Sequence, residues 1–518
     1  MSSKRERPTV KKVRVDEDEI RSRKIEPYIE PDEGEEPELP EEESAIAAER
    51  KKNNRSIMAI TYVFLALFVG MIIHLVYFVG WESDQVINSS YNRRETVLAE
   101  RVVRGKIISS DGVVLAETLT DDDGDEYRYY PYKNMFAHSV GRVNRGKTGL
   151  ESSTNLKMLY SHDNGLRNAW SELKGNKLAG DNVITTLNFE LQKVAYDALG
   201  DRDGVVIAIE PDTGKILCMV SKPDYNPNTI EQNWEDLIAE DAEESALLNR
   251  ATQGLYPPGS TFKVLTTLAF MRQKTKFRDF TYTCAGTFSY MDVKIQCYNQ
   301  TAHGTQSLKE AFANSCNSAF AKIGSELDWD EFYEMCETFF FNTTLPSNVA
   351  AAKSQFQLDG SGSKSLIPQT SIGQGDTLMT PMHNAMMAAM IANGGVLMKP
   401  YLVDRYESSS GSWKDKNSPE LYNTMMSPDE VKVLTECMRA VVSDGTAAKG
   451  FATAKYRAAG KTGSAEYNAE KESHAWFIGF APYDDPEIAI CVLVEGGGSG
   501  GTAAVPIARK VFDAWLDK

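Results

Sequence analysis

The stretch YPPGSTFKVLTTLAF, Tyr256 to Phe270, carries the strongest signal for the fold of this chain. Two prolines and a glycine interrupt the backbone just before a run of mostly apolar residues, so the pattern predicts a helix that begins near Ser260. Free backbone N–H groups and the helix dipole favour negative charge at such a position. Lys263 follows one turn later on the same face, so its amine is within reach of the Ser260 hydroxyl.

This pair of residues suggests a nucleophile and its base. A serine hydroxyl is a weak nucleophile and needs a neighbouring base. Lys263 can act as that base only after losing its proton, which burial and a second nearby cation would promote. A Ser-x-x-Lys pair alone is weak evidence, because it also occurs on solvated helix faces. The Pro-Pro-Gly lead-in and the apolar run favour the catalytic interpretation.

A second polar motif lies in ANSCNSAFAKIG, which contains Ser315-Cys316-Asn317. Ser315 is a candidate relay of a proton between Lys263 and a leaving group, and Asn317 is a candidate to hold a substrate amide. Read alone, the motif is a polar helix cap. No histidine motif accompanies Cys316, so we expect it to be a buried filler rather than a nucleophile.

A third motif lies in AAGKTGSAEY, which contains Lys461-Thr462-Gly463. On a strand, Lys461 and Gly463 share one face, and the glycine leaves room for a ligand backbone against the strand edge. Lys461 and Thr462 are then candidates to hold a terminal carboxylate. The Ser464 N–H is expected to complete an oxyanion hole with the N–H of Ser260.

In this order the three motifs resemble the serine penicillin-recognising enzymes, whose pattern is Ser-x-x-Lys, Ser-x-Asn, Lys-Thr-Gly. The separations, 55 positions from 260 to 315 and 146 from 315 to 461, are similar to those of class B penicillin-binding proteins. Further segments extend the resemblance over nearly everything after Trp81: RGKIISSDGVVLA from Arg104, GLE from Gly149, SIGQGDTLMTP from Ser371, VVSDGTA from Val441, AWFIGFAP from Ala475 and the glycine run 496–501.

The pattern along the chain and this resemblance together imply an α+β protein. We expect a single N-terminal transmembrane helix, a small β-rich pedestal, and a transpeptidase domain in which helices flank an antiparallel five-stranded sheet, as in serine β-lactamases. The expected boundaries are a disordered cytoplasmic tail over 1–56, the membrane helix over 57–81, a reduced pedestal over 82–182 and the transpeptidase domain over 183–518. Expected elements of that domain are a hairpin from Gly204, helices over 307–325, 380–393 and 505–516, and strands over 456–465, 474–481 and 488–495.

The membrane helix is predicted from the apolar run between Ile57 and Trp81, where His74 is the only side chain that titrates near neutral pH. The run exceeds the roughly 20 residues that cross a bilayer. It lacks the polar face of a core helix and is too long for a signal peptide. Basic residues precede it and acidic ones follow it: Arg50, Lys51, Lys52 and Arg55, then Glu82 and Asp84. The positive-inside rule places the N-terminus in the cytoplasm and the catalytic domain outside, in a single-pass protein.

The net charge, the cysteine spacing and the context of one motif argue against nucleic-acid binding, a zinc or redox site, and ATP binding. A net charge of −17 argues against nucleic acid as a partner. The seven cysteines form no C-x-x-C pair, so no zinc or redox site is expected, and a bridge between Cys284 and Cys297 is left open. GRVNRGKT, from Gly141 to Thr148, matches the phosphate-loop pattern G-x-x-x-x-G-K-T at every position. The segment before it is a poor core strand, so ATP binding is not expected.

The resemblance implies a peptidoglycan D,D-transpeptidase that serves cell elongation or division. Ser260 would attack the penultimate D-Ala carbonyl of a stem peptide, expel the terminal D-Ala and pass the acyl group to a neighbouring stem. β-Lactams would acylate the same serine. No metal or cofactor is implied, and a polytopic glycosyltransferase is the expected partner. A D,D-carboxypeptidase, a β-lactamase and a non-catalytic sensor or scaffold remain as rival interpretations, to be separated by the fate of bound penicillin and by a Ser260→Ala protein.

Overall fold

The computed structural model describes residues 41–78, 93–239, 245–358, 363–466 and 472–517. The chain divides into two compact units, Met1–Gln85 and Val86–Lys518. Each unit is described by itself.

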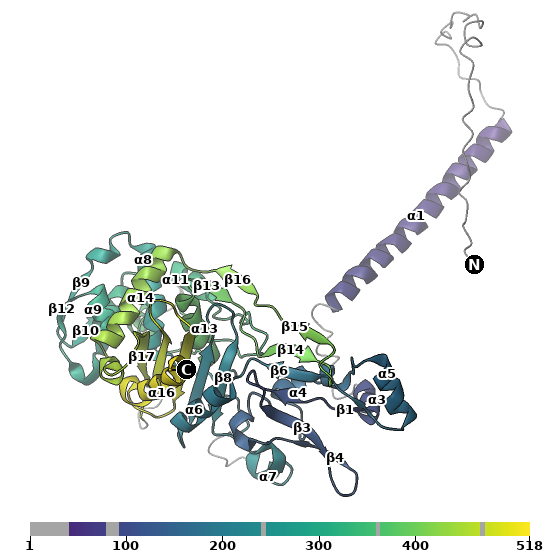
Figure 1. Ribbon diagram of the computed structural model, residues 1–518. Helices are drawn as coiled ribbons and strands as arrows, with labels where there is room; N and C mark the ends of the chain where they lie inside the picture. The colour runs from purple at the N-terminus through teal and green to yellow at the C-terminus, as the bar shows by residue number, and fades with distance from the viewer. Residues whose placement is uncertain (1–40, 79–92, 240–244, 359–362, 467–471, 518) are drawn as a thin grey trace, which may run out of the picture. The chain divides into compact units, whose positions relative to one another are not determined.

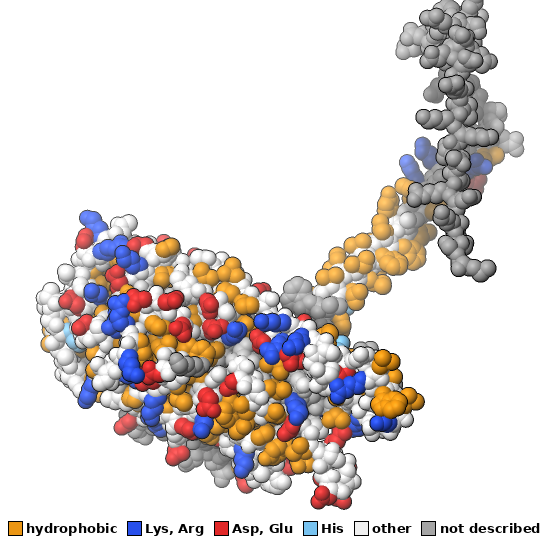
Figure 2. All heavy atoms as spheres, viewed as in Figure 1, with side chains coloured by type: hydrophobic (Ala, Val, Ile, Leu, Met, Phe, Trp, Pro, Cys, Tyr) orange, Lys and Arg blue, Asp and Glu red, His pale blue; other side chains and the backbone are white. Residues whose placement is uncertain are grey.

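The first unit contains the long helix α1, Glu41–Tyr77. Its span Ala48–Tyr77 has a mean hydropathy of 2.4 over its most apolar window, which is long and apolar enough to cross a membrane. Figure 2 shows the apolar side chains along this helix and basic side chains near its N-terminal part. The helix begins earlier than Ile57, so Glu41–Ser56, expected to be disordered, is helical. This segment, EEESAIAAERKKNNRS, is rich in strong helix formers. The rest of the expected tail, 1–40, and the expected end of the span, 79–81, lie outside the described residues.

The second unit is built around an antiparallel five-stranded sheet with the order β17-β18-β19-β7-β8. Its strands are β17 (Ala459–Ala465), β18 (His474–Ala481), β19 (Ile488–Val494), β7 (Gly204–Ile209) and β8 (Ile216–Lys222). Every residue of β7, β18 and β19 is buried, because helices cover both faces of the sheet. The five-stranded sheet and its α+β setting confirm the predicted fold class.

Three helices supply most of that cover. Helices α6 (Phe189–Leu199) and α16 (Gly500–Leu516) pack on each other and on the sheet, while α13 (Pro381–Ala392) packs on β7, β18 and β19. Figure 1 shows α16 and α6 together on one side of the sheet. Helix α8 (Lys263–Gln273) is also almost entirely buried. This arrangement leaves the edge strand β17 beside the start of α8.

A second sheet of six strands has the order β15-β14-β6-β2-β3-β4. Its strands are β2 (Ile107–Ile108), β3 (Val114–Thr120), β4 (Glu126–Tyr129), β6 (Asn182–Thr185), β14 (Val403–Glu407) and β15 (Lys414–Lys416). Figure 1 shows the green β14 and β15 beside these earlier strands. The sheet therefore takes strands from both sides of the boundary that was expected at 182/183.

Buried charged side chains connect the segments around β2, β4 and α4 (Gly149–Ser153). The Glu151 carboxylate is fully buried and accepts hydrogen bonds from Arg104 Nε and Arg128 Nε, each at 2.7 Å. Burial alone would raise the pKa of the Glu151 carboxyl, but the two guanidinium groups outweigh it and hold the pKa below its usual range. Glu151 is the acidic residue of the GLE segment.

The remaining helices and strands lie around these sheets. The helices are α3 (Arg93–Arg101), α4 (Gly149–Ser153), α5 (Gly165–Leu173), α7 (Trp234–Leu237), α9 (Leu308–Ala313), α10 (Asn317–Gly324), α11 (Trp329–Thr338), α12 (Ile367–Thr370), α14 (Pro428–Ser443) and α15 (Ala448–Phe451). The strands are β1 (Val102–Val103), β5 (Leu178–Ala179), β9 (Thr281–Cys284), β10 (Thr287–Tyr290), β11 (Val293–Gln296), β12 (Gly304–Ser307), β13 (Val396–Met398) and β16 (Leu421–Thr424).

The prediction of one continuous helix over 307–325 is wrong. Helix α9 ends at Ala313 and α10 begins at Asn317. Between them Ser315 has a φ of 53°, a left-handed conformation that an α-helix cannot contain. Cys316 caps α10, with its sulfur accepting the Ala319 N–H at 3.4 Å. The break turns Ser315 and Asn317 toward Lys263.

The segment that matches a phosphate loop does not have the structure of one. Residues 141–148 follow turns rather than a strand and lead into α4, a helix of only five residues. The Thr148 N–H closes the loop onto the Arg142 carbonyl at 3.1 Å. The strand and the long helix that a phosphate loop requires are absent from this described segment, in agreement with the rejection of ATP binding.

Candidate active site

The candidate nucleophile Ser260 lies in a 3-10 turn, Gly259–Phe262, that continues directly into α8. Gly259 has a φ of 53°, and its N–H donates to the Gly373 carbonyl at 2.8 Å. A Cβ at this position would lie 2.7 Å from the Ser464 carbonyl oxygen. The turn therefore needs glycine for its conformation and for its close approach to β17, which brings Ser260 next to the Lys-Thr-Gly strand.

Lys263, one turn beyond Ser260, is fully buried. Its Nζ donates to the Ser315 carbonyl at 2.7 Å, to Asn317 Oδ1 at 2.7 Å and to Ser315 Oγ at 3.3 Å. Burial lowers the pKa of the Lys263 amine to about 7. A substantial fraction of these amines is thus neutral near neutral pH, as a base beside a serine requires.

Lys461 on β17 completes the same hydrogen-bond network. Its Nζ donates to Ser315 Oγ at 2.8 Å and to the Thr462 carbonyl at 2.9 Å. Lys461 is also fully buried, and burial followed by repulsion from Lys263 lowers the pKa of its amine well below the usual range. Ser315 Oγ therefore lies between two lysine amines, and the structure brings residues of all three motifs together.

Gly463 lies against the nucleophile turn. Its Cβ position would lie 3.0 Å from Trp476 Cβ, 3.1 Å from Thr261 Cγ2 and 3.2 Å from the Pro258 carbonyl oxygen. The space that a side chain would take at this glycine is filled by the nucleophile turn and its neighbours. Strand β17 is an edge strand of the five-stranded sheet, and Ser464 on it is half-buried beside Gly259.

Two groups of residues around the site were not identified from sequence. Thr446 forms a hydroxyl–hydroxyl hydrogen bond with Thr462 at 2.5 Å. Its segment, VVSDGTA, carried part of the resemblance, but nothing in its pattern indicated this contact. Tyr256, just before the nucleophile turn, donates to Glu495 Oε1 at 2.6 Å, and Arg250 Nε donates to the same oxygen at 2.7 Å. Glu495 follows β19, the central strand of the sheet, so this contact ties the segment before the nucleophile turn to the end of β19.

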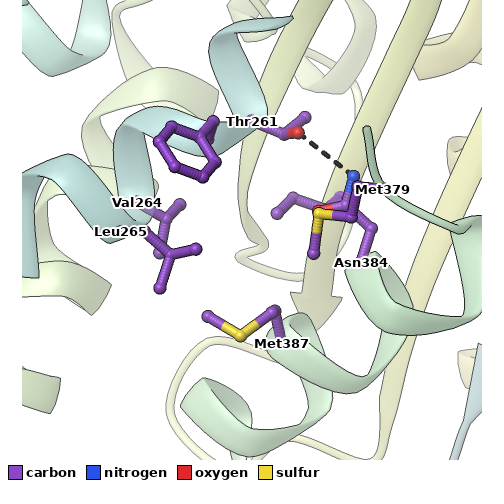
Figure 3. A pocket seen from close by; sticks show the side chains of 8 residues that line it. Thr261, Val264, Leu265, Met379, Asn384 and Met387 are labelled. Atoms are coloured by element: carbon purple, nitrogen blue, oxygen red, sulfur yellow. Dashed lines mark hydrogen bonds between the residues drawn. The ribbon is translucent and has the colours of Figure 1, made fainter. Parts of the chain in front are cut away.

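A small, mostly apolar cavity lies behind the nucleophile turn (Figure 3). Its walls come from α8, α13 and β18, with these lining residues: Thr261, Phe262, Val264, Leu265, Met379, Asn384, Met387 and Ile478. Figure 3 shows the hydrogen bond in which Asn384 Nδ2 donates to Thr261 Oγ1, at 3.1 Å. The cavity lies on the core side of the turn, so we assign it to packing and not to substrate binding.

The cysteine pair that sequence left open is not bridged. The sulfur atoms of Cys284 and Cys297 are 3.7 Å apart, and all seven cysteines are free thiols. Cys297 is also 3.7 Å from Cys316, the middle residue of the Ser-x-Asn motif. The thiols of Cys284, Cys297 and Cys316 thus form a small group beside the break between α9 and α10 that carries Ser315.

Comparisons with known proteins agree with this geometry. The penicillin binding protein transpeptidase domain matches residues 204–513, and the penicillin binding protein A dimerisation domain matches residues 104–183. Peptidoglycan D,D-transpeptidase PbpA of Mycolicibacterium smegmatis is 33% identical over 497 residues, covering 89% of this chain and 99% of that protein. The protein of the same name from Mycobacterium tuberculosis is 32% identical with the same coverage.

Solved structures give the same result. Penicillin-binding protein A from M. tuberculosis, as an imipenem acyl-enzyme complex, has a TM-score of 0.73 at 33% identity and covers 80% of this chain and 98% of that chain. The D,D-transpeptidase domain of a peptidoglycan glycosyltransferase from Eggerthella lenta has a TM-score of 0.71 at 29% identity, covering 80% of this chain and 99% of that chain. Because the transpeptidase domain spans more than half of the sequence and the PbpA relatives align over almost their whole length, this chain belongs to the penicillin-binding protein transpeptidases.

Proposed function

We propose that this chain is a peptidoglycan D,D-transpeptidase that cross-links stem peptides through an acyl-enzyme on Ser260. The observation that carries the proposal is the buried Lys263 amine, whose pKa is lowered to about 7 one turn from Ser260. The neutral amine would take the Ser260 proton as the hydroxyl attacks the penultimate D-Ala carbonyl. The family and the relatives named D,D-transpeptidases support this reaction, and a relative with β-lactam acyl-enzyme structures supports β-lactams as inhibitors.

We assign roles to the other site residues as well. Ser315 Oγ, held by both lysine amines, would pass the proton to the departing D-Ala amine. Asn317 would hold a substrate amide, and Lys461 with Thr462 would hold the terminal carboxylate. The backbone N–H groups of Ser260 and Ser464 would bind the developing oxyanion, while Gly463 lets the turn and the strand approach each other.

The deciding experiment is intact-mass spectrometry of the full-length chain in detergent after incubation with benzylpenicillin. A persistent single adduct on the wild type that is absent from Ser260→Ala is the expected result. Release of hydrolysed penicillin within seconds would favour a β-lactamase. An unmodified wild type would favour a non-catalytic scaffold, and growth rescue by Ser260→Ala would support that alternative.

The proposal extends to the placement of the protein. We assign 82–182 to a reduced pedestal and 183–518 to the transpeptidase domain, a division supported by the matches at 104–183 and 204–513. Helix α1 would anchor the protein as a single membrane span, with the N-terminus in the cytoplasm and the catalytic domain outside. A polytopic glycosyltransferase would supply the glycan strands, and its co-purification with the full-length chain from cross-linked membranes tests that partnership.

A further inference from the structure

Three cysteines and a histidine from separate segments converge beside the Ser-x-Asn motif. Cys284 ends β9, Cys297 follows β11, His303 precedes β12, and Cys316 lies between α9 and α10. The ligand atoms of all four side chains lie within 4.8 Å of one another. The three thiols are buried and His303 is half-buried.

The separations between these atoms fit four ligands around one ion. Sγ of Cys297 is 3.7 Å from Sγ of Cys284 and 3.7 Å from Sγ of Cys316, and His303 Nδ1 is 3.5 Å from Cys284 Sγ. With Zn–S near 2.3 Å and Zn–N near 2.0 Å, tetrahedral geometry requires S–S separations of about 3.8 Å and S–N separations of about 3.5 Å. These three distances agree with those values, and the remaining separations are within 4.8 Å.

Backbone and side-chain polar groups contact all three sulfur atoms. The Gly286 N–H donates to Cys284 Sγ at 3.3 Å, and the Ala319 N–H donates to Cys316 Sγ at 3.4 Å. Ser318 Oγ lies 3.2 Å from Cys297 Sγ.

We propose that Cys284, Cys297, His303 and Cys316 bind one zinc ion as a closed, four-coordinate structural site. Three thiolates and an imidazole are a typical ligand set for zinc. On binding, the three thiols release three protons to solvent, and His303 coordinates through Nδ1 while its proton stays on Nε2. No oxidation takes place, and the occupied site carries a net charge of −1.

The zinc site would fix the turn between α9 and α10, which carries the proposed active-site residues Ser315 and Asn317. Cys316 stands between Ser315 and Asn317, and Ser315 has the strained φ of 53°. Asn317 Nδ2 donates to the Gln296 carbonyl at 2.9 Å, next to Cys297. An ion that ties Cys316 to Cys297 would therefore hold this turn against Lys263. This positioning role rests on the proposed function, whereas metal binding itself does not.

Local sequence patterns do not indicate this site, and no metal was expected from them. Zinc ligands are usually recognised from a C-x-x-C pair. Here the spacing is C-x12-C-x5-H-x12-C, and only the folding of β9 to β12 and the break at Ser315 bring the four residues together.

The test is the metal content of the full-length chain, purified in detergent without chelator. We expect about one zinc ion per chain in the wild type, a loss of that zinc in Cys297→Ser, and full retention in Cys437→Ala, a matched control that removes a buried thiol outside the cluster. Retention of zinc by Ser260→Ala would separate metal binding from catalysis. A wild type without zinc overturns the proposal, whether the thiols prove free or a disulfide joins Cys297 to Cys284 or Cys316.

A second measurement covers the case in which Cys297→Ser does not fold. Wild type exchanged with cobalt(II) should show the thiolate-to-cobalt charge-transfer bands of a tetrahedral site, and Cys437→Ala should show the same bands. Their absence from folded, cobalt-treated wild type overturns the proposal. Removing the ion should also slow acylation by benzylpenicillin at least several-fold, and re-addition of zinc should restore the rate. An unchanged rate in a metal-free, folded sample would overturn the positioning role alone.

Discussion

Both lysines of the site have neutral hydrogen-bond acceptors around their amines. Lys263 donates to a carbonyl, a hydroxyl and an amide oxygen, and Lys461 donates to a hydroxyl and a carbonyl. No carboxylate among these partners stabilises the charged form, so burial dominates and the pKa of each amine falls. The surroundings of Lys263 therefore favour a neutral amine that can act as a base, and not a charged amine in an ion pair.

Acylation should accordingly depend on pH with a definite sign. Protonated Lys263 cannot accept a proton, so the second-order rate of acylation by benzylpenicillin should rise about tenfold per pH unit below a midpoint near pH 7 and level off above it. Stopped-flow or quenched mass spectrometry across this range measures the profile. Lys263→Arg stays protonated and should be slower by at least about 10²-fold with no such rise. A wild-type rate that falls as pH increases through 7 would contradict a lysine base.

Thr446 should orient the hydroxyl of Thr462. If Thr462 donates its proton to a substrate carboxylate, the hydrogen bond between the two hydroxyls must be donated by Thr446. Thr446→Val keeps the side-chain shape but removes that donor, so the dissociation constant of the benzylpenicillin pre-complex should rise about 5- to 10-fold, or ~1 to 1.5 kcal/mol. Thr446→Ser should restore binding. The dependence of acylation on penicillin concentration separates this constant from the chemical step; an effect on the chemical step alone would refute the assignment.

At the scale of elements, the site depends on how closely the nucleophile turn approaches β17. Gly259 and Gly463 face each other's segments, and a Cβ on either would contact the opposite backbone or side chains. Gly373 fixes the turn from another side, through its carbonyl. The glycine positions are therefore set by the packing of one element on another.

Gly463→Ala should push the turn away from the strand. The added Cβ would lie 3.0 to 3.2 Å from three atoms, one in the turn and one in the residue just before it, so we expect a loss of about 1 to 3 kcal/mol in the free energy of unfolding and slower acylation of Ser260. Gly165→Ala is the matched control, because its Cβ would meet nothing within 4 Å. Urea unfolding and acylation kinetics on both variants provide the comparison. Equal behaviour of the two would show that the close approach is unimportant.

The elements also show what sequence could and could not predict. Strands β7, β8, β18 and β19 are apolar runs bounded by turn residues, and the three motifs stand in a recognisable order, so the sheet and the site residues were both predictable. The break between α9 and α10 was not, because apolar spacing continues through it and only the backbone of Ser315 reveals it. The Thr446–Thr462 bond and the thiol cluster depend on contacts between distant segments, which local patterns do not contain.

Over the whole chain, charge and hydropathy distinguish the apolar helix of the first unit from the folded second unit. Helix α1 has an apolar stretch with Arg50, Lys51, Lys52 and Arg55 at its N-terminal side. The second unit has a buried core and carries all of the proposed catalytic residues. The proposed cross-linking of peptidoglycan would require the catalytic unit to lie outside the membrane, which is the orientation proposed from the charges around α1.

That orientation is testable on the intact protein. Because four basic residues precede the span, an epitope placed before Met1 should stay in the cytoplasm, and one placed after Lys518 should lie outside. In spheroplasts, antibody added externally should bind the C-terminal epitope, and the N-terminal epitope should become accessible only after permeabilisation. Changing the four basic residues to glutamine, with every residue after Trp81 left as it is, should weaken this preference and yield a mixed population. External labelling of the N-terminal epitope on the wild type would place the catalytic unit in the cytoplasm and exclude the proposed role in peptidoglycan cross-linking.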